Sequence, residues 1–299
     1  MIRNSREGAW RADLALVFIA LIWGSTFVVV KEALADTSTL LFLALRFSLA
    51  TVSLGLVFRP LPGKFARRTP WMKGGVLAGL CLFGGYAFQT FGLRYTTPSK
   101  SAFITGLSIV MVPALAALVQ RKVPHPSEAL GVAVATAGLV LMTMPAGSLQ
   151  IEKGDLLTLA CAVAFAVHIL VVGYYAPKIG FQALTLVQLA TTAAMSLASF
   201  WWLETPFIRW SAGVVSAVII TGLLATALAF AVQAWAQQYT TPTRTALIFA
   251  LEPVFAWATS FVATGEVLSR QAALGAALIL SGILLVELKP FAPGRRPGA

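Results

Sequence analysis

Charged side chains are scarce in this chain of 299 residues. Only 11% of the residues are Asp, Glu, Lys or Arg, and 58% are hydrophobic, whereas soluble globular domains carry about 25% charged residues. A soluble protein of this length could not hide so much apolar surface from water. The composition therefore excludes an ordinary soluble domain and predicts a protein that is solvated by a lipid bilayer.

Acidic residues are the scarcest of the charged residues, with 11 Asp and Glu against 22 Lys and Arg, so the formal net charge is +11. This basic excess does not form a basic domain, because the cations lie in short runs between long apolar stretches. Such runs are typical of loops that face the cytoplasm and anionic lipid. Nucleic acid is therefore not an expected partner, whereas the lipid bilayer is.

Cysteine and histidine are almost absent, with two residues of each. Cys81 and Cys161 both lie deep in apolar stretches, where small buried hydrophobes are favoured over a disulfide. Neither residue type shows a metal-ligand spacing, and the sequence has no Walker-type phosphate loop. We expect no catalytic residues, no bound metal and no cofactor.

Ten apolar stretches run through the chain, and each is long enough for a membrane helix, which needs about 20 residues. Their backbone groups must be paired within each segment in lipid, so we expect helices and not open strands. The predicted spans are 13–30, 39–58, 74–93, 99–119, 129–145, 155–175, 181–203, 212–236, 242–264 and 271–288. The fold class is thus an all-α membrane protein with ten transmembrane helices.

The distribution of positive charge predicts the orientation. Most of the 22 Lys and Arg residues lie on the side that holds both termini, which places both termini in the cytoplasm and the chain in the bacterial inner (plasma) membrane as a multi-pass protein. The first apolar run resembles a signal peptide, with Ala33-Leu34-Ala35 as a cleavage site. Because the run 14–30 is long for a signal core, retention as the first membrane helix is favoured.

An internal repeat is the strongest pattern in the sequence. The segment Tyr95–Ala102 (YTTPSKSA) matches Tyr239–Ala246 (YTTPTRTA) at an offset of 144 residues, and the same offset takes Gln89 to Gln233. The earlier helices align at an offset of 142, which takes Asp13 to Asp155. We therefore divide the chain into a first repeat of five helices, residues 1–145, and a second, residues 146–299, that ends in a short cytoplasmic tail.

Five helices is an odd number, so the second repeat begins on the opposite side of the membrane. The repeats are then inverted, related by a pseudo-two-fold axis in the membrane plane. This arrangement suits alternating access, with one site near the midplane and two gates of related structure. It predicts a secondary transporter with a small-molecule substrate, and a chain that holds both repeats can work as a monomer.

Several short motifs together resemble the EamA-type drug/metabolite transporter superfamily. They are Trp23-Gly24-Ser25-Thr26-Phe27 with Lys31, Leu45-Arg46-Phe47, the Thr-Pro-x-x-x-Ala helix starts at 97–102 and 241–246, Leu251-Glu252-Pro253, Gly275 and Gly282. The resemblance covers nearly the whole chain. It implies ten helices in two EamA-like repeats and gradient-linked movement of metabolites, often export. The aromatic amino acid exporters are one branch of this superfamily into which the chain could fall.

The sequence also departs from the superfamily pattern. The first repeat has Gln120-Arg121-Lys122 where these proteins often have Gly-Glu, and His168 stands where the other repeat has Thr26. Substrate specificity is therefore not carried over from the resemblance.

Charged or titratable residues inside membrane spans are costly and are functional candidates, and three stand out here. Glu252 precedes Pro253 and can bind a proton or a substrate amine, or it can be a packing device paired with Arg46. Arg46 can bind a substrate carboxylate, gate the path, or snorkel, and its repeat partner is the neutral Gln188. His168 can relay protons or be a hydrogen-bonded packing residue. Because Pro113 and Pro253 are not repeat equivalents, we expect the two halves to bend at different depths.

Two symmetric amides and their aromatic neighbours complete the candidate site. Gln89 and Gln233 follow Tyr86 and Phe230 by one helical turn, so each amide shares a helix face with an aromatic ring. Trp23 and Trp235 add stacking surface. The alternative for the amides is bridging between helices, and for the tryptophans it is anchoring at the lipid interface.

Export of a small organic metabolite, an amino acid or a similar solute, is the favoured function, and we expect no enzymatic activity. The alternative is an importer or antiporter of a phosphorylated or nucleotide-linked solute. That function should need several buried cations, and only Arg46 lies clearly inside a span. A membrane-embedded enzyme or a channel subunit is less favoured, because the buried polar residues are scattered and the inverted repeat serves transport.

Overall fold

The computed structural model describes residues 5–58, 69–96, 98–120, 125–143, 152–264 and 269–288, and helices make up nearly all of them. The helices are α1 (Ser5–Ala33), α2 (Thr39–Phe58), α3 (Thr69–Leu93), α4 (Pro98–Gly106), α5 (Ser108–Gln120), α6 (Pro126–Thr143), α7 (Lys153–Ile179), α8 (Phe181–Leu203), α9 (Ala212–Gly222), α10 (Ala229–Ala236), α11 (Pro242–Phe249), α12 (Glu252–Thr264) and α13 (Arg270–Leu288). A π-helical segment, η1 (Leu223–Leu228), joins α9 to α10.

Within the described parts, these elements combine into ten successive helical segments, as predicted. Three segments contain more than one element: α4 with α5, α9 with η1 and α10, and α11 with α12. Among the described residues, 6 helices are long and apolar enough to cross a membrane, and shorter apolar helices span Ile104–Val119, Pro126–Leu141 and Arg270–Val286. The all-α fold class is therefore confirmed, and the apolar helices are those of a multi-pass membrane protein.

The fourth and ninth segments are interrupted at equivalent places. Helix α4 ends at Gly106 and α5 begins at Ser108, whereas α11 ends at Phe249 and α12 begins at Glu252. Leu107 and Leu251, which lie in the two interruptions, are repeat partners. The expectation that the halves bend at different depths is therefore wrong. Pro113 lies inside α5 without ending it, so the position in the repeat, and not the proline, sets the break.

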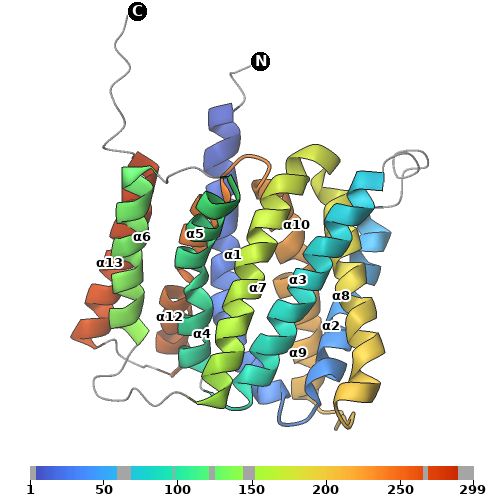
Figure 1. Ribbon diagram of the computed structural model, residues 1–299. Coiled ribbons are helices and arrows are strands. Elements are labelled where there is room, and N and C mark those ends of the chain that lie inside the picture. Colours follow the sequence, from blue (N-terminus) through green and yellow to red (C-terminus); the bar gives the residue numbers. More distant parts are fainter. Residues whose placement is uncertain are drawn as a thin grey trace, which may run out of the picture.

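Helices α6 and α13 form a closely packed pair at one edge of the bundle (Figure 1). Glycines make this close approach possible. A Cβ on Gly138 would lie 2.5 Å from the carbonyl oxygen of Gly275, and a Cβ on Gly131 would lie 2.7 Å from that of Gly282. The two glycine pairs are thus a packing seam between the last helices of the two repeats.

The bundle has two ends, which we name by where α1 begins. Helix α1 begins and α13 ends on one side, the terminal face, and the turns after α1 and α3 lie on the other, the opposite face (Figure 1). The turn after α10 returns to the terminal face. The direction of each helix therefore shows which of its residues lie near the terminal face and which lie near the opposite face.

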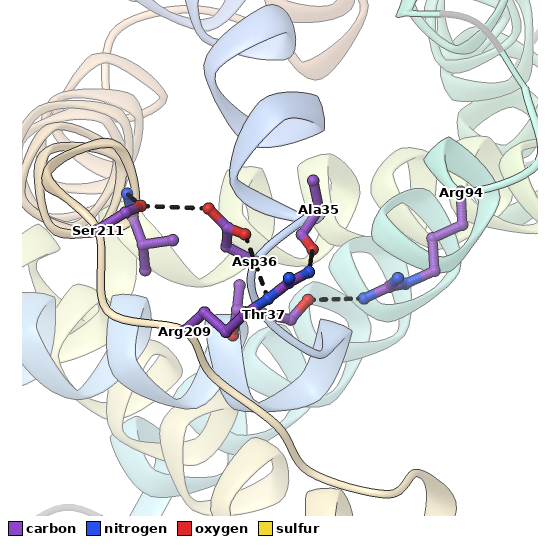
Figure 2. Close-up of polar contacts among 7 residues, drawn as sticks. Ala35, Asp36, Thr37, Arg94, Arg209 and Ser211 are labelled. Carbon is purple, nitrogen blue, oxygen red and sulfur yellow. Dashed lines mark hydrogen bonds and ion pairs between the residues drawn. The ribbon is translucent and has the colours of Figure 1, made fainter.

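A clasp of loops covers part of the opposite face. The turn after α1 pairs with the connection before α9 through an antiparallel bridge between Thr37 and Ile208. Figure 2 shows the side chains around it: Asp36 accepts from the Ser211 hydroxyl at 3.2 Å, and Arg94 donates to the Thr37 carbonyl at 2.8 Å. Arg209 pairs with Asp36 at 3.5 Å. The clasp joins the first repeat to the second at this face.

Candidate functional site: a central cavity between the repeats

A cavity lies between the two repeats near the middle of the bundle, with an empty volume of about 830 Å³ that includes open solvent. The lining residues are Trp23, Thr26, Phe27, Val30, Arg46, Tyr86, Gln89, Thr90, Leu93, Ala102, Thr105, Gly106, Ser108, Phe165, His168, Ile169, Phe230, Gln233, Phe249 and Glu252. They come from both repeats, so neither repeat forms the cavity alone.

The structure brings together nearly all of the candidate residues named from sequence. Trp23, Arg46, Tyr86, Gln89, His168, Phe230, Gln233 and Glu252 all line the cavity. Trp235 does not: its ring contacts Tyr239, with centroids 5.5 Å apart, and the side chain packs against a hydrophobic cluster. Because Trp235 follows Gln233 by only two residues, it points to a different side of α10, and we exclude it from the site.

Aromatic rings form the walls of the cavity around Phe230. Its ring lies 5.4 Å from Trp23 and 6.0 Å from Tyr86, measured between centroids. The His168 ring meets the same phenyl ring at 5.7 Å, edge to face, and Phe165 meets Tyr86 at 5.3 Å. Such tilted contacts hold the rings in fixed orientations, so the apolar part of the cavity is preorganised.

Arg46 is the one cation among the described lining residues. Its guanidinium is buried, with 3% of the residue exposed, and it lies over the Tyr86 ring at 4.5 Å from the centroid. Nε donates to the Thr226 hydroxyl at 2.6 Å, while Nη2 donates to the Tyr86 hydroxyl at 3.1 Å and to the Ala225 carbonyl at 3.2 Å. A guanidinium has five N–H donors, so the Nη1 donors are not used by these bonds and are available to an anion.

The π-helical segment η1 supplies the acceptor that holds Arg46. The Ala225 carbonyl accepts from the Trp23 indole at 2.8 Å as well as from Arg46. A π-helical turn shifts the backbone register and often occurs at functional sites. Here one carbonyl of the segment ties α1 and α2 to the eighth helical segment, which fixes the arginine against the aromatic wall.

Glu252 lines the cavity from the interruption between α11 and α12. It is the first residue of α12, and Pro253 follows it, so the carboxylate sits at a helix N-terminus, which favours negative charge. No side chain or backbone group in the described parts donates a hydrogen bond to it, and it forms no ion pair there with Arg46. The pairing of Glu252 with Arg46 as a packing device is therefore not observed.

Gly24 brings α1 against the backbone of Glu252. A Cβ on Gly24 would lie 2.5 Å from the Glu252 carbonyl oxygen and 2.9 Å from the Ala256 nitrogen. Nearby, the Ser25 and Thr259 hydroxyls lie 2.9 Å apart. The contact positions the start of α12, and with it the carboxylate, beside the aromatic wall.

The two repeat-related amides are held differently. Gln89 donates to the Thr105 hydroxyl at 3.2 Å. Gln233 donates to the Gln237 side chain at 3.1 Å, and Gln237 in turn donates to the Ile169 carbonyl at 2.9 Å. The Gln233 side-chain oxygen is buried without a hydrogen-bond partner. Gln89 thus bridges α3 and α4, whereas Gln233 is linked to α7 only through Gln237. Both amides also line the cavity.

His168 is fixed by the repeat partner of Arg46. An imidazole nitrogen of His168 lies 2.9 Å from the side-chain oxygen of Gln188, and both residues are buried, at 1% and 0% exposure. The side-chain nitrogen of Gln188 has no hydrogen-bond partner. The bond orients the imidazole toward the Phe230 ring, which is consistent with a packing role and also leaves one ring edge on the cavity.

Some lining residues were not named as site candidates from sequence, and the internal repeat could have found a few of them. Seven lining positions of each repeat are equivalent: Trp23 with Phe165, Thr26 with His168, Phe27 with Ile169, Tyr86 with Phe230, Gln89 with Gln233, Thr105 with Phe249, and Ser108 with Glu252. Carrying each candidate to its partner therefore reaches Thr26, Ser108 and Phe165. Phe27, Ile169, Thr105 and Phe249 have no such signal, because they resemble ordinary packing residues.

Comparison with known proteins gives the family. The model of the EamA-like transporter family matches residues 10–144 and again 152–288. An uncharacterized transporter of Archaeoglobus fulgidus is 35% identical over 291 residues, covering 96% of this chain and 90% of that protein. The uncharacterized transporter YoaV of Bacillus subtilis is 23% identical, covering 91% of this chain and 95% of that protein.

A solved structure titled "Crystal structure of protein" has the same fold, with a TM-score of 0.76 and 21% identity over 93% of this chain and 97% of that one. The family model covers both repeats, and the relatives that match over nearly their full length are named transporters. The chain therefore belongs to the EamA-like transporter family.

Proposed function

We propose that this protein is a secondary transporter that exports a small organic zwitterion, such as an amino acid, from a bacterial cytoplasm by alternating access. In this proposal the residues 1–145 and 146–299 are inverted repeats, both termini are cytoplasmic, and the monomer is the working unit. The terminal face is then the cytoplasmic face. The coupling ion is a proton carried by Glu252.

The observation that carries the proposal is the charge pattern of the cavity. One cation, Arg46, and one carboxylate, Glu252, line the same space without pairing with each other in the described residues. A buried charge without a partner costs several kcal/mol, on the order of the penalty per ion in a protein interior. A solute with both a carboxylate and an ammonium group would compensate both charges at once, and the aromatic wall would hold its apolar part.

The competing function, import or antiport of a phosphorylated or nucleotide-linked solute, has less support. A phosphate carries up to two negative charges and usually binds several cations or backbone donors. Among the described lining residues, Arg46 is the one positive group, and it faces a carboxylate across the cavity. Catalysis has less support still, because no described lining residue is a nucleophile paired with a base.

Transport by the purified protein in proteoliposomes tests the proposal. Labelled amino acids are screened by counterflow, and the best solute is compared with its amine analogue, which lacks the carboxylate, and its acid analogue, which lacks the ammonium. Charge-assisted hydrogen bonds are worth about 1.5–3 kcal/mol, so each analogue should compete about tenfold or more weakly than the zwitterion.

Two substitutions test which cavity residue binds the carboxylate of the solute and which binds its ammonium group. Arg46→Gln should weaken the zwitterion and the acid analogue but leave competition by the amine analogue unchanged, and Arg46→Lys should partly restore binding. Glu252→Gln should show the reverse pattern, with only the acid analogue unaffected. Equal losses for all three solutes in both variants would contradict recognition of a zwitterion, and no flux of any amino acid would contradict the proposed substrate class.

A further inference from the structure

The cavity is not symmetric, although the site at its centre is. Seven equivalent positions of each repeat line it, but six further lining residues, Arg46 and five others, come from the first repeat alone. The five others, the first-repeat extension, are Val30, Thr90, Leu93, Ala102 and Gly106. Their repeat partners, the second-repeat set, are Val172, Ala234, Gln237, Ala246 and Ala250, and each of these is at most 1% exposed. No residue of the second-repeat set lines the cavity.

The additional lining residues of the first repeat lie toward one face of the bundle. On α1 the lining residues lie between positions 23 and 30, and on α3 between 86 and 93, the parts that approach the opposite face. Ala102 follows the start of α4, which lies at the same face. The cavity therefore reaches from the midplane toward the opposite face, and the parts of the second repeat that approach the terminal face are closed around Gln237 and Ala246.

Direct contacts hold the terminal side closed. Arg244, near the start of α11, forms an ion pair with Asp13 of α1. Gln237 donates to the Ile169 carbonyl at 2.9 Å, and Gln238 donates to the Ala176 carbonyl at 2.9 Å, so α10 is tied to α7. These bonds must break before the second-repeat set can separate.

We infer that the second-repeat set is an inner vestibule, which lines the solute path when the protein opens to the terminal face. The inference rests on the proposed alternating access: two inverted repeats exchange conformations, so each repeat in turn lines the open half of the path. The vestibule differs from the first-repeat extension at three positions: Gln237 replaces Leu93, Ala234 replaces Thr90 and Ala250 replaces Gly106. The inner path therefore holds an amide, next to the unpartnered oxygen of Gln233, where the outer path has a leucine.

A matched pair of alanines makes the inference testable without knowing the solute. Ala102→Cys and Ala246→Cys are placed separately in a protein whose Cys81 and Cys161 are replaced by Ser, and each is labelled with a membrane-impermeant maleimide in vesicles of known orientation. A tag at residue 299 reports which face is outside. Ala102→Cys should react from the opposite face, whereas Ala246→Cys should be nearly inert in the same background.

Breaking the inner ion pair should then open the vestibule. We expect Arg244→Gln to raise the labelling rate of Ala246→Cys at least tenfold, from the terminal face only, and to lower that of Ala102→Cys. The control is Arg209→Gln, which removes an exposed ion pair of the clasp at the opposite face (Figure 2) and should leave Ala246→Cys inert. Gln237→Cys provides a second reporter if Ala246→Cys lowers the folded yield.

The outcome is independent of the solute screen. If both reporters stay inert in the Arg244→Gln protein while it elutes as a folded species, or if they react from the opposite face, the vestibule is overturned even where transport is measured. If the reporters respond as expected but no amino acid is transported, the vestibule stands and only the proposed substrate class fails.

Discussion

The two repeats share one scaffold but divide the charges between them. At equivalent positions the first repeat has Arg46 and Ser108, and the second has Gln188 and Glu252. Each repeat therefore contributes one charge of opposite sign to a cavity in which other equivalent pairs, such as Tyr86 with Phe230 and Gln89 with Gln233, keep the same type of residue. The comparison teaches that the symmetric part of the sequence builds the cavity, whereas the departures from symmetry give the cavity its chemistry.

The largest effect is expected from a substitution at Glu252, which differs in charge from its repeat partner Ser108. Glu252→Gln keeps the shape of the side chain and removes its titration, which makes the second repeat as neutral as the first at this position. If the carboxylate carries the coupling proton, flux should fall by at least about tenfold, the effect of losing a contact worth about 1.4 kcal/mol, and its dependence on pH should flatten.

Ser108→Ala is the matched control, because it changes the equivalent position of the first repeat and removes no charge. Its flux should stay within about twofold of the parent, with the same pH profile. A Glu252→Gln protein that is less stable but transports normally per folded molecule would make Glu252 a structural residue and would leave the amides and aromatic rings as the site.

The second-largest effect is expected at Gly24, where α1 packs closely against the start of α12. Its repeat partner is Ala166, so Gly24→Ala makes the two positions identical. The added methyl group would meet the Glu252 carbonyl and the Ala256 nitrogen, which are backbone atoms and cannot rotate away. We expect a loss of about 1–3 kcal/mol, the usual range for overpacking, measured as a lower melting temperature of the detergent-solubilised protein, together with reduced flux.

Gly55→Ala controls for helix propensity, since nothing lies within 4 Å of a Cβ at that position. Alanine is favoured over glycine in a helix by up to about 1 kcal/mol, so this variant should be unchanged or slightly more stable. Equal destabilisation by both substitutions would mean that the contact between α1 and α12 is not close-packed.

Most of the fold could be predicted from the sequence, because the lipid solvent leaves few alternatives to apolar helices. The predicted spans 39–58 and 212–236 coincide with α2 and with the segment from α9 to α10. The interruption at Leu107 and the π-helical segment η1 could not be predicted. Their residues are ordinary helix formers in lipid, and the breaks depend on contacts with other helices, as with the Ala225 carbonyl that accepts from Trp23 and Arg46.

The candidate site was predictable where polarity or the repeat marked a residue. Arg46, Glu252 and the two amides stand out in apolar spans, and all of them line the cavity. Trp235 was misplaced because an aromatic residue in a membrane helix carries no signal of the face it occupies. The depth asymmetry of the cavity could not be predicted either, since the two repeats share one pattern and nothing in it marks which repeat lines the cavity further.

The smallest expected effect concerns the turns that tether the third helix of each repeat. In the first repeat Arg94, just after α3, donates to the Thr39 hydroxyl at 2.6 Å. It also donates to the Thr37 carbonyl at 2.8 Å (Figure 2). Its repeat partner Gln238 makes a single such bond, to the Ala176 carbonyl. The opposite face therefore has the stronger tether, which agrees with a clasp that stays closed while the cavity approaches that face.

Arg94→Gln places in the first repeat the same side chain that Gln238 has at the equivalent position of the second. A glutamine can keep one of the two hydrogen bonds, and a hydrogen bond contributes about 0.5–1.5 kcal/mol net, so we expect a loss of about 1 kcal/mol in stability and little change in flux. Gln238→Arg is the reciprocal change. Among the described residues Gln238 has one acceptor, the Ala176 carbonyl, so the additional donors of an arginine should not stabilise the protein. Melting temperatures measured side by side with proteoliposome flux separate the two properties. A large loss of flux in the Arg94→Gln protein at unchanged stability would mean that the clasp opens during transport, and the tether would then belong to the outer gate instead of the fixed frame.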